Sequence, residues 1–163
     1  KQIAEMAGVN EATLFRKYGS KIELVVKAIK SSMEQSDVKS TIYYTGDVRE
    51  DLSRILTRFF EVESQRTEGH IFMLLASEMK RHPELQQIVS IPLGVIAEVG
   101  KLIARYQSEG ILKMENPIQA TATLIGPIAL IQRLGSFSSD FEMPEIDLPA
   151  VIDNYLTGRL VKT

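Results

Sequence analysis

The stretch GVNEATLFRKYGSK, residues 8–21, decides how this sequence is interpreted. It places a glycine, an asparagine, an aromatic residue and three basic side chains close together. Gly8 can adopt the left-handed conformation that a tight turn requires, and Asn10 is a natural N-cap for a following helix. The order therefore predicts two short helices joined by a turn, with the second helix at residues 11–17.

A third helix is expected directly after this pair. Gly19 ends the second helix, Ser20 is an N-cap residue, and Glu23 completes a capping box. The helix is expected to run to about residue 35, because apolar residues recur along it at helical spacing. These residues are Ile22, Val25, Val26, Ile29 and Met33.

The rest of the chain also has the periodicity of helices. Pro92 and Pro117 are placed to start helices, and Asp147 is placed to cap one. The one strand-like run, residues 41–45, is too short to found a sheet. We expect a linker at 37–46 and helices at 47–66, 70–82, 92–108, 117–134 and 147–160. The predicted fold is all-α, with a partial helix-turn-helix domain (1–36) followed by a helical-bundle domain (37–163).

Composition excludes several kinds of function. The chain of 163 residues has no cysteine, which rules out disulfides, thiolate metal sites and cysteine nucleophiles. His70 and His82 lie near expected helix ends and have no metal-binding motif around them. We therefore expect no enzymatic activity, no metal and no cofactor. We also expect a cytoplasmic protein without a membrane span, because the uncharged run 117–132 is short and contains polar residues.

The charge is distributed unevenly along the chain. Residues 1–30 carry a net charge of +3 and the remainder –5, within a total of -2. A basic end on an acidic body suits a protein that faces phosphate at one end only. An excess of three positive charges also arises by chance. The charge distribution alone therefore favours neither DNA binding nor chance.

The helix–turn–helix order is the layout in which the second helix enters the major groove of DNA. Ala4, Ala7, Val9 and Leu14, together with Ile3, are expected to form the small core between the helices. The stretch IAEMAGVNEATLFRKYGSKIEL, residues 3–24, resembles the signature of the TetR family of bacterial transcriptional regulators. The matching residues are Ile3, Ala4, Ala7, Gly8, Val9, Leu14, Ser20, Lys21 and Leu24.

Three positions depart from the family pattern. Asn10 replaces the usual serine and keeps the cap, Phe15 replaces a tyrosine, and Tyr18 replaces a phenylalanine. The resemblance implies that Lys21 meets a phosphate and that Leu14 is core. The residues implied to face DNA are Asn10, Glu11, Ala12, Thr13, Phe15, Arg16, Lys17, Tyr18 and Lys21.

Family members carry a further helix before the one that holds Ile3. We therefore expect this sequence to be part of a longer protein. We also expect residues 1–20 to be more mobile than the body.

The resemblance also implies an effector pocket in the helical body. An apolar set around Phe59 and Phe72 includes flexible thioethers, which suit an adaptable pocket but are equally expected of ordinary core. The Gly126-Pro127 pair is expected to kink its helix and leave room beside it, although such a kink is equally expected of ordinary packing. The predicted pocket residues are Phe59, Phe72, Met73, Leu75, Met79, Ile96, Ile125 and Ile128.

The helices at 117–134 and 147–160 are expected to form a four-helix interface in a homodimer. The alternative is that their apolar faces close the core of one monomer. The predicted interface residues are Ile118, Ala122, Ile131, Leu134, Val151 and Tyr155.

Together these features predict a homodimeric repressor. It would bind a double-stranded DNA operator, and a small apolar or amphipathic effector would release it from the DNA. The helix at 20–35 would link the DNA-binding helix to the effector pocket in the body. The alternative is a helical ligand-binding protein without DNA function.

Overall fold

The computed structural model describes residues 2–6, 8–64, 79–135 and 145–161. Within these ranges the chain forms helices and no β-strand, apart from one isolated bridge between Leu112 and Leu160. The expected all-α class is confirmed. The α-helices are α1 (Gln2–Met6), α2 (Glu11–Tyr18), α3 (Lys21–Gln35), α4 (Val48–Ser64), α6 (Gln86–Ser108), α7 (Pro117–Gly135) and α8 (Leu148–Thr157), and the 3-10 helices are η1 (Val38–Thr41) and η2 (Pro83–Leu85).

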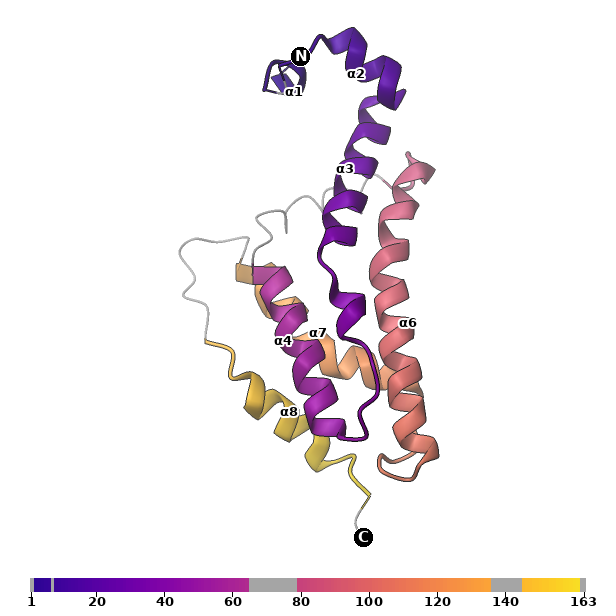
Figure 1. Ribbon diagram of the computed structural model, residues 1–163, viewed down its shortest axis with the longest axis vertical. Coiled ribbons are helices and arrows are strands. Elements are labelled where there is room, and N and C mark those ends of the chain that lie inside the picture. The colour runs from indigo at the N-terminus through magenta and orange to yellow at the C-terminus, as the bar shows by residue number, and fades with distance from the viewer. Residues whose placement is uncertain (1, 7, 65–78, 136–144, 162–163) are drawn as a thin grey trace.

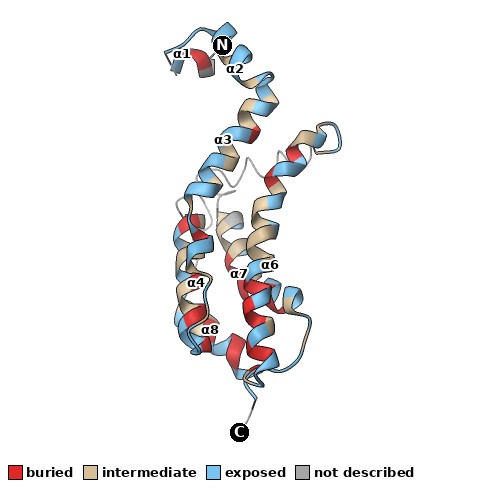
Figure 2. Cartoon of the chain, turned by 45° about the vertical axis from the view of Figure 1, so that its right-hand side comes forward, coloured by how far each residue is buried: buried red, intermediate tan, exposed pale blue. Residues whose placement is uncertain are grey.

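The molecule has a slender N-terminal end and a packed body. Figure 1 shows α1 and α2 at one end of the long axis, with α3 leading from them to the body. In the body α6 packs against α7 and α3, and α4 packs against α7 and α8. Buried residues gather at the end of the body farthest from α1 and α2, as Figure 2 shows.

The caps predicted around α2 and α3 are present. The Asn10 side chain accepts a hydrogen bond from the Ala12 amide at 3.0 Å. The Ser20 hydroxyl accepts from the Glu23 amide, and the Glu23 carboxylate accepts from the Ser20 amide, each at 3.1 Å. These local bonds fix the starts of α2 and α3, because each satisfies a backbone donor that has no partner within the helix.

The expected start of a helix at Pro92 was wrong. Pro92 lies inside α6, which begins at Gln86. Proline removes the bond to the carbonyl of Ile88, but tertiary packing holds the early turns. Leu85 and Ile88 are buried against Val26 of α3. This packing offsets one missing backbone bond, so the helix continues through the proline.

Two other boundaries differ from expectation. The helix expected at 70–82 does not reach His82: residues 79–81 form a turn, and residues 70–78 lie outside the described part of the chain. The last helix ends at Thr157, three residues before the expected end at 160. The chain beyond it instead pairs with residues 111–113, because the Val161 amide donates to the Ile111 carbonyl at 3.0 Å. The linker expected at 37–46 contains η1.

The segment from Pro83 to Ser108 is long and apolar enough to cross a membrane by length and composition, with a mean hydropathy of 1.5. In this structure α6 packs in the body against α7 and α3. The main core joins α6 to three other helices. Its fully buried residues include Leu52, Ile55, Leu56, Ile103, Leu124 and Ile128.

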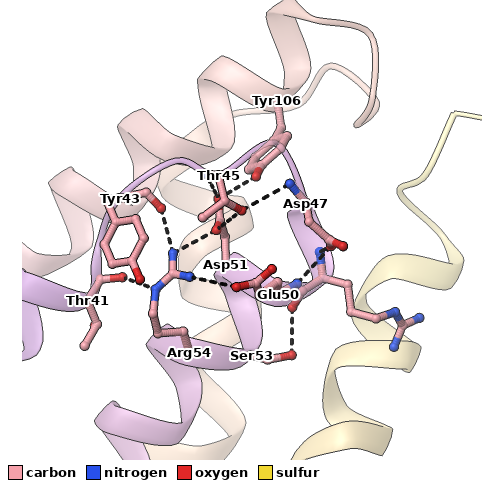
Figure 3. A network of polar contacts seen from close by, with 10 residues as sticks. Thr41, Tyr43, Thr45, Asp47, Glu50, Asp51, Ser53, Arg54 and Tyr106 are labelled. Atoms are coloured by element: carbon pink, nitrogen blue, oxygen red, sulfur yellow. Dashed lines mark hydrogen bonds and ion pairs between the residues drawn. The ribbon is translucent and has the colours of Figure 1, made fainter.

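One carboxylate lies inside this apolar core. Asp51 has no exposed surface, and its oxygens accept bonds from the Tyr106 hydroxyl at 2.5 Å and the Arg54 guanidinium at 2.8 Å. They also accept from the Thr45 amide at 3.0 Å and the Thr45 hydroxyl at 2.7 Å. Figure 3 shows these groups converging from α4, α6 and the loop before α4. Burial alone would raise the pKa of Asp51, but the bonds from Tyr106, Thr45 and Arg54 outweigh burial and lower it.

We expect Asp51→Asn to lower the free energy of unfolding by about 2 kcal/mol, because the amide nitrogen that replaces one carboxylate oxygen cannot accept the hydrogen bonds donated to that oxygen. Urea unfolding followed by circular dichroism at fixed protein concentration measures this. The matched control is Asp153→Asn, whose side chain is 56% exposed and pairs with Arg49. The control should cost less than about 1 kcal/mol.

The same bonds predict a pH dependence. Folding lowers the pKa of Asp51. The ionised carboxylate therefore contributes fully to the free energy of unfolding above its ordinary pKa of about 4, and this contribution is lost as the pH falls through the lower pKa of the folded state. The advantage of the wild type over Asp51→Asn should therefore shrink in acid. If the wild type keeps the same stability advantage over Asp51→Asn down to the pH at which it unfolds in acid, the lowered pKa of Asp51 is contradicted.

Candidate nucleic-acid interface and ligand cavity

Helix α2 lies at the narrow end of the molecule (Figure 1). None of its side chains is buried: Leu14 and Tyr18 are half-buried and the others are exposed. Every other residue predicted to face DNA is also exposed, including Asn10 and Lys21. The structure therefore brings the predicted residues together on one accessible end of the chain.

Of the small core expected between α1 and α2, the structure describes the side chains of Ala4, Val9 and Leu14, while those of Ile3 and Ala7 lie outside the described part. Ala4 is 3% exposed and Leu14 is half-buried, whereas Val9 is 41% exposed. Val9 therefore does not belong to a closed core in this structure. The backbone of the turn is still fixed, because the Val9 amide donates to the Ala4 carbonyl at 3.0 Å.

Two lysines flank the ring of Tyr18. The ammonium of Lys17 lies 5.3 Å from the ring centroid and that of Lys27, from α3, lies 5.5 Å from it. Such cation–π contacts hold positive charge beside α2. Lys27 was absent from the residues predicted to face DNA. Its position on the polar face of α3, one to two turns beyond Lys21, is the sequence signal that places it near this surface.

The α2–α3 turn is geometrically restrictive. Gly19 has a φ of 80°, in the left-handed region that favours glycine. A Cβ at Gly19 would lie 2.0 Å from the Glu23 carboxylate, which belongs to the capping box of α3. Lys21, the first residue of α3, is thus set beside α2 by a turn that tolerates little change.

A cavity of about 420 Å³ lies in the body among α3, η1, α4, α6 and α7. Most of its walls are apolar, and a few polar side chains lie among them, as is typical of small-molecule sites. The lining residues are Met33, Glu34, Ser36, Asp37, Val38, Lys39, Phe59, Val62, Glu63, Ile91, Pro92, Val95, Ile96, Ala122, Ile125, Gly126 and Ala129.

The cavity contains some of the predicted pocket residues. Phe59, Ile96 and Ile125 line it, and Gly126 lines it beside Pro127. Two predicted residues lie elsewhere. Ile128 is fully buried in the main core, and Met79 packs on the smaller cluster around Val26, Leu85 and Ile88. Phe72, Met73 and Leu75 lie outside the described residues.

The wall formed by the end of α3 and by η1 was not predicted. It contributes Met33, Ser36, Asp37 and Val38. Helical periodicity assigned the apolar residues of α3 to one stripe, but it could not show that the linker folds back against α6. Contacts between η1 and both α4 and α6 produce this arrangement.

The residues predicted for the dimer interface differ in exposure. Ile118 and Leu134 are 50% and 53% exposed on α7, and Leu130, which was not predicted, is 58% exposed. Ala122 is exposed and lines the cavity, while Ile131 and Val151 are half-buried. Tyr155 is buried in the core of its own chain. Burial raises the pKa of Tyr155 to about 12.

The described residues include no group of three or more histidine, aspartate or glutamate side chains placed to hold a metal ion. His82 lies beside η2, with its ring 3.7 Å from the Glu84 carboxylate. His70 lies outside the described residues.

The arrangement of helices is similar to that of two solved structures that are named as regulators. A structure from Mesorhizobium loti MAFF303099 assigned to the TetR family matches with a TM-score of 0.76 and 16% identity, over 98% of this chain and 85% of that one. The flavonoid-responsive regulator FrrA matches with a TM-score of 0.67 and 19% identity, over 99% of this chain and 86% of that one. No family model and no curated protein matches the sequence. The likeness establishes the fold.

We expect Gly19→Ala to destabilise the α2–α3 unit more than Gly8→Ala. Both glycines have positive φ, but a Cβ at Gly8 meets nothing within 4 Å, whereas one at Gly19 displaces Glu23 from its bond to Ser20. The extra loss of about 1 kcal/mol should speed amide exchange in α2 about fivefold relative to Gly8→Ala. Hydrogen exchange with mass spectrometry measures this.

Gly158→Ala is the matched control, because Gly158 has open space around it and lacks a positive φ. It should leave exchange in α2 unchanged. Equal effects of Gly8→Ala and Gly19→Ala would contradict the role given to the capping box.

Proposed function

We propose that the protein is a DNA-binding transcriptional regulator of the TetR type, acting as a repressor. The observation that carries the proposal is the exposed α2, preceded by a capped glycine turn and followed by a capped α3, at the end of a TetR-type fold. Two solved structures with this fold are named as regulators. The residues of this end, 1–36, would form the DNA-binding domain and residues 37–163 the regulatory domain.

The proposed contacts follow from the side chains of α2 and the start of α3. Thr13 and Arg16 are exposed on α2, and Lys21 lies at the N-terminus of α3. A lysine there reaches phosphate, and the free amides of a helix N-terminus favour an anion at the same place. The α2 residues would enter the major groove, while Lys17 and Lys27 beside Tyr18 add positive potential.

The cavity would hold the effector. Its apolar walls suit a small apolar or amphipathic molecule, and FrrA shows by its name that a regulator of this fold can respond to a flavonoid. Helix α3 begins beside α2 and ends at the cavity, so an occupant that favours one direction of α3 would change operator affinity. Such coupling is typically about 1–3 kcal/mol.

A homodimer would present two copies of α2 about 34–36 Å apart, one turn of DNA. The exposed apolar residues of α7, Ile118, Leu130 and Leu134, support this assembly. Tyr155 is buried within its own chain, so it would support the dimer interface from the core of that chain and would not contact the partner chain.

The second candidate is a helical ligand-binding protein without DNA function. The cavity favours it, since none of the described residues that line the cavity belongs to α1 or α2. The two candidates differ in one respect: only the regulator needs Arg16 and Lys21 for its activity.

Titration against a DNA fragment from upstream of its own gene, followed by fluorescence anisotropy at two salt concentrations, tests the regulator. We expect tight, salt-sensitive binding, and Lys21→Ala and Arg16→Ala should each weaken it and reduce the salt slope by about 1. Lys101→Ala is the matched control, because Lys101 is an exposed lysine on α6 that pairs with Glu98. If the wild type and both variants bind the fragment only at the non-specific level, the second candidate is favoured.

The dimer is tested by Leu134→Glu. A charge buried in an apolar interface is costly, so the mass in solution should fall from two chains to one, as measured by size-exclusion chromatography with light scattering. Met114→Glu is the control, since Met114 is 79% exposed in the loop before α7. A Leu134→Glu protein that stays dimeric places the interface elsewhere.

A further inference from the structure

Two arginines of α4 hold the connection between α3 and α4 by its main-chain carbonyls. Arg58 donates to the Ser36 carbonyl from Nε at 3.0 Å and from Nη2 at 2.8 Å. Arg54 donates to the Thr41 carbonyl at 3.0 Å and to the Tyr43 carbonyl at 2.8 Å. The arginines are four residues apart, so they lie on the same face of α4.

The two contacts are anchored to different degrees. The Arg54 guanidinium also pairs with the buried Asp51 at 2.8 Å and lies 3.6 Å from the centroid of the Tyr43 ring. The other partner of Arg58 is Glu61 at 3.1 Å, and the two side chains are 34% and 49% exposed. Exposed ion pairs contribute little, so Arg58 is the more easily released of the two.

The chain changes direction at the residues that Arg58 holds. Helix α3 ends at Gln35, and Asp37 follows with φ 52° and ψ 24°, a left-handed conformation. Among the described residues other than glycine, Asp37 has the one positive φ. An L-residue in this conformation is strained, and surrounding contacts must maintain it.

The same residues form part of the cavity wall. Ser36 and Asp37 line it on one side of the Arg58 contact, and Phe59 and Val62, which follow Arg58 on α4, line it on the other. A molecule in the cavity therefore touches both of the segments that Arg58 joins.

We propose that Arg58 is a positioning residue that sets the direction of α3, and with it α2, relative to the body, and that cavity occupancy acts through its contact with Ser36. The regulatory consequence rests on the proposed function, but the positioning itself does not require DNA. Arg54 keeps the linker in place in both states, and the Ser36–Asp37 junction moves.

The experiment measures the distance between α2 and α6. The chain has no cysteine, so Ala12→Cys and Lys101→Cys provide two spin-label sites in the full chain. Mixing with excess unlabelled chain restricts pulsed electron spin resonance to distances within one chain. Ala129→Phe fills the cavity from α7 and serves as the occupant, because Ala129 lines the cavity.

We expect Arg58→Gln to broaden the distance distribution at least twofold and to abolish the shift that Ala129→Phe produces in the wild type. Arg58→Lys, which keeps the positive charge and a single donor nitrogen, should give an intermediate width. Arg49→Gln is the matched control, since Arg49 lies on the same helix but pairs with Asp153 of α8. Far-UV circular dichroism checks that each variant is folded.

The proposal is overturned if folded Arg58→Gln protein has the wild-type distribution both with and without Ala129→Phe. This outcome is distinct from failure of the regulator hypothesis, because no DNA is present. A protein that does not bind DNA can still show the Arg58-dependent distance.

Discussion

The buried carboxylate of Asp51 is the constraint on which the arrangement of this chain depends. A charge in an apolar core is costly unless every acceptor site is used, and Asp51 meets that condition with donors from Thr45, Arg54 and Tyr106. These groups belong to α4, α6 and the loop before α4 (Figure 3). Satisfying one carboxylate therefore fixes the start of α4 against α6.

The consequences of this anchor reach the other end of the molecule. Because Asp51 holds Arg54, and Arg54 holds the carbonyls of Thr41 and Tyr43, the linker returns along α4 and forms a wall of the cavity. The linker in turn leads back to α3 at the contact between Arg58 and Ser36. One continuous set of contacts thus runs from the core to the helix that carries the α2 surface.

Sequence reasoning succeeded where the determining contacts are local. Asn10 caps α2, and Ser20 and Glu23 cap α3, through bonds that span two or three residues, so both helix starts could be predicted. It failed where distant contacts decide. Pro92 is compatible with α6 only because buried residues of α3 and α6 meet, and the linker's place in the cavity wall depends on the Asp51 network. The α2 surface was therefore predictable, while much of the cavity was not.

We propose above all that the α2–α3 end is the surface that meets DNA. The most direct test is hydrogen exchange of the full chain with and without an operator fragment, read peptide by peptide. We expect slower exchange in α2 and the first turn of α3, and unchanged exchange in α8 and in the part of α6 at the far end of the body. Protection confined to the body, or no protection at DNA concentrations that saturate binding, would contradict it.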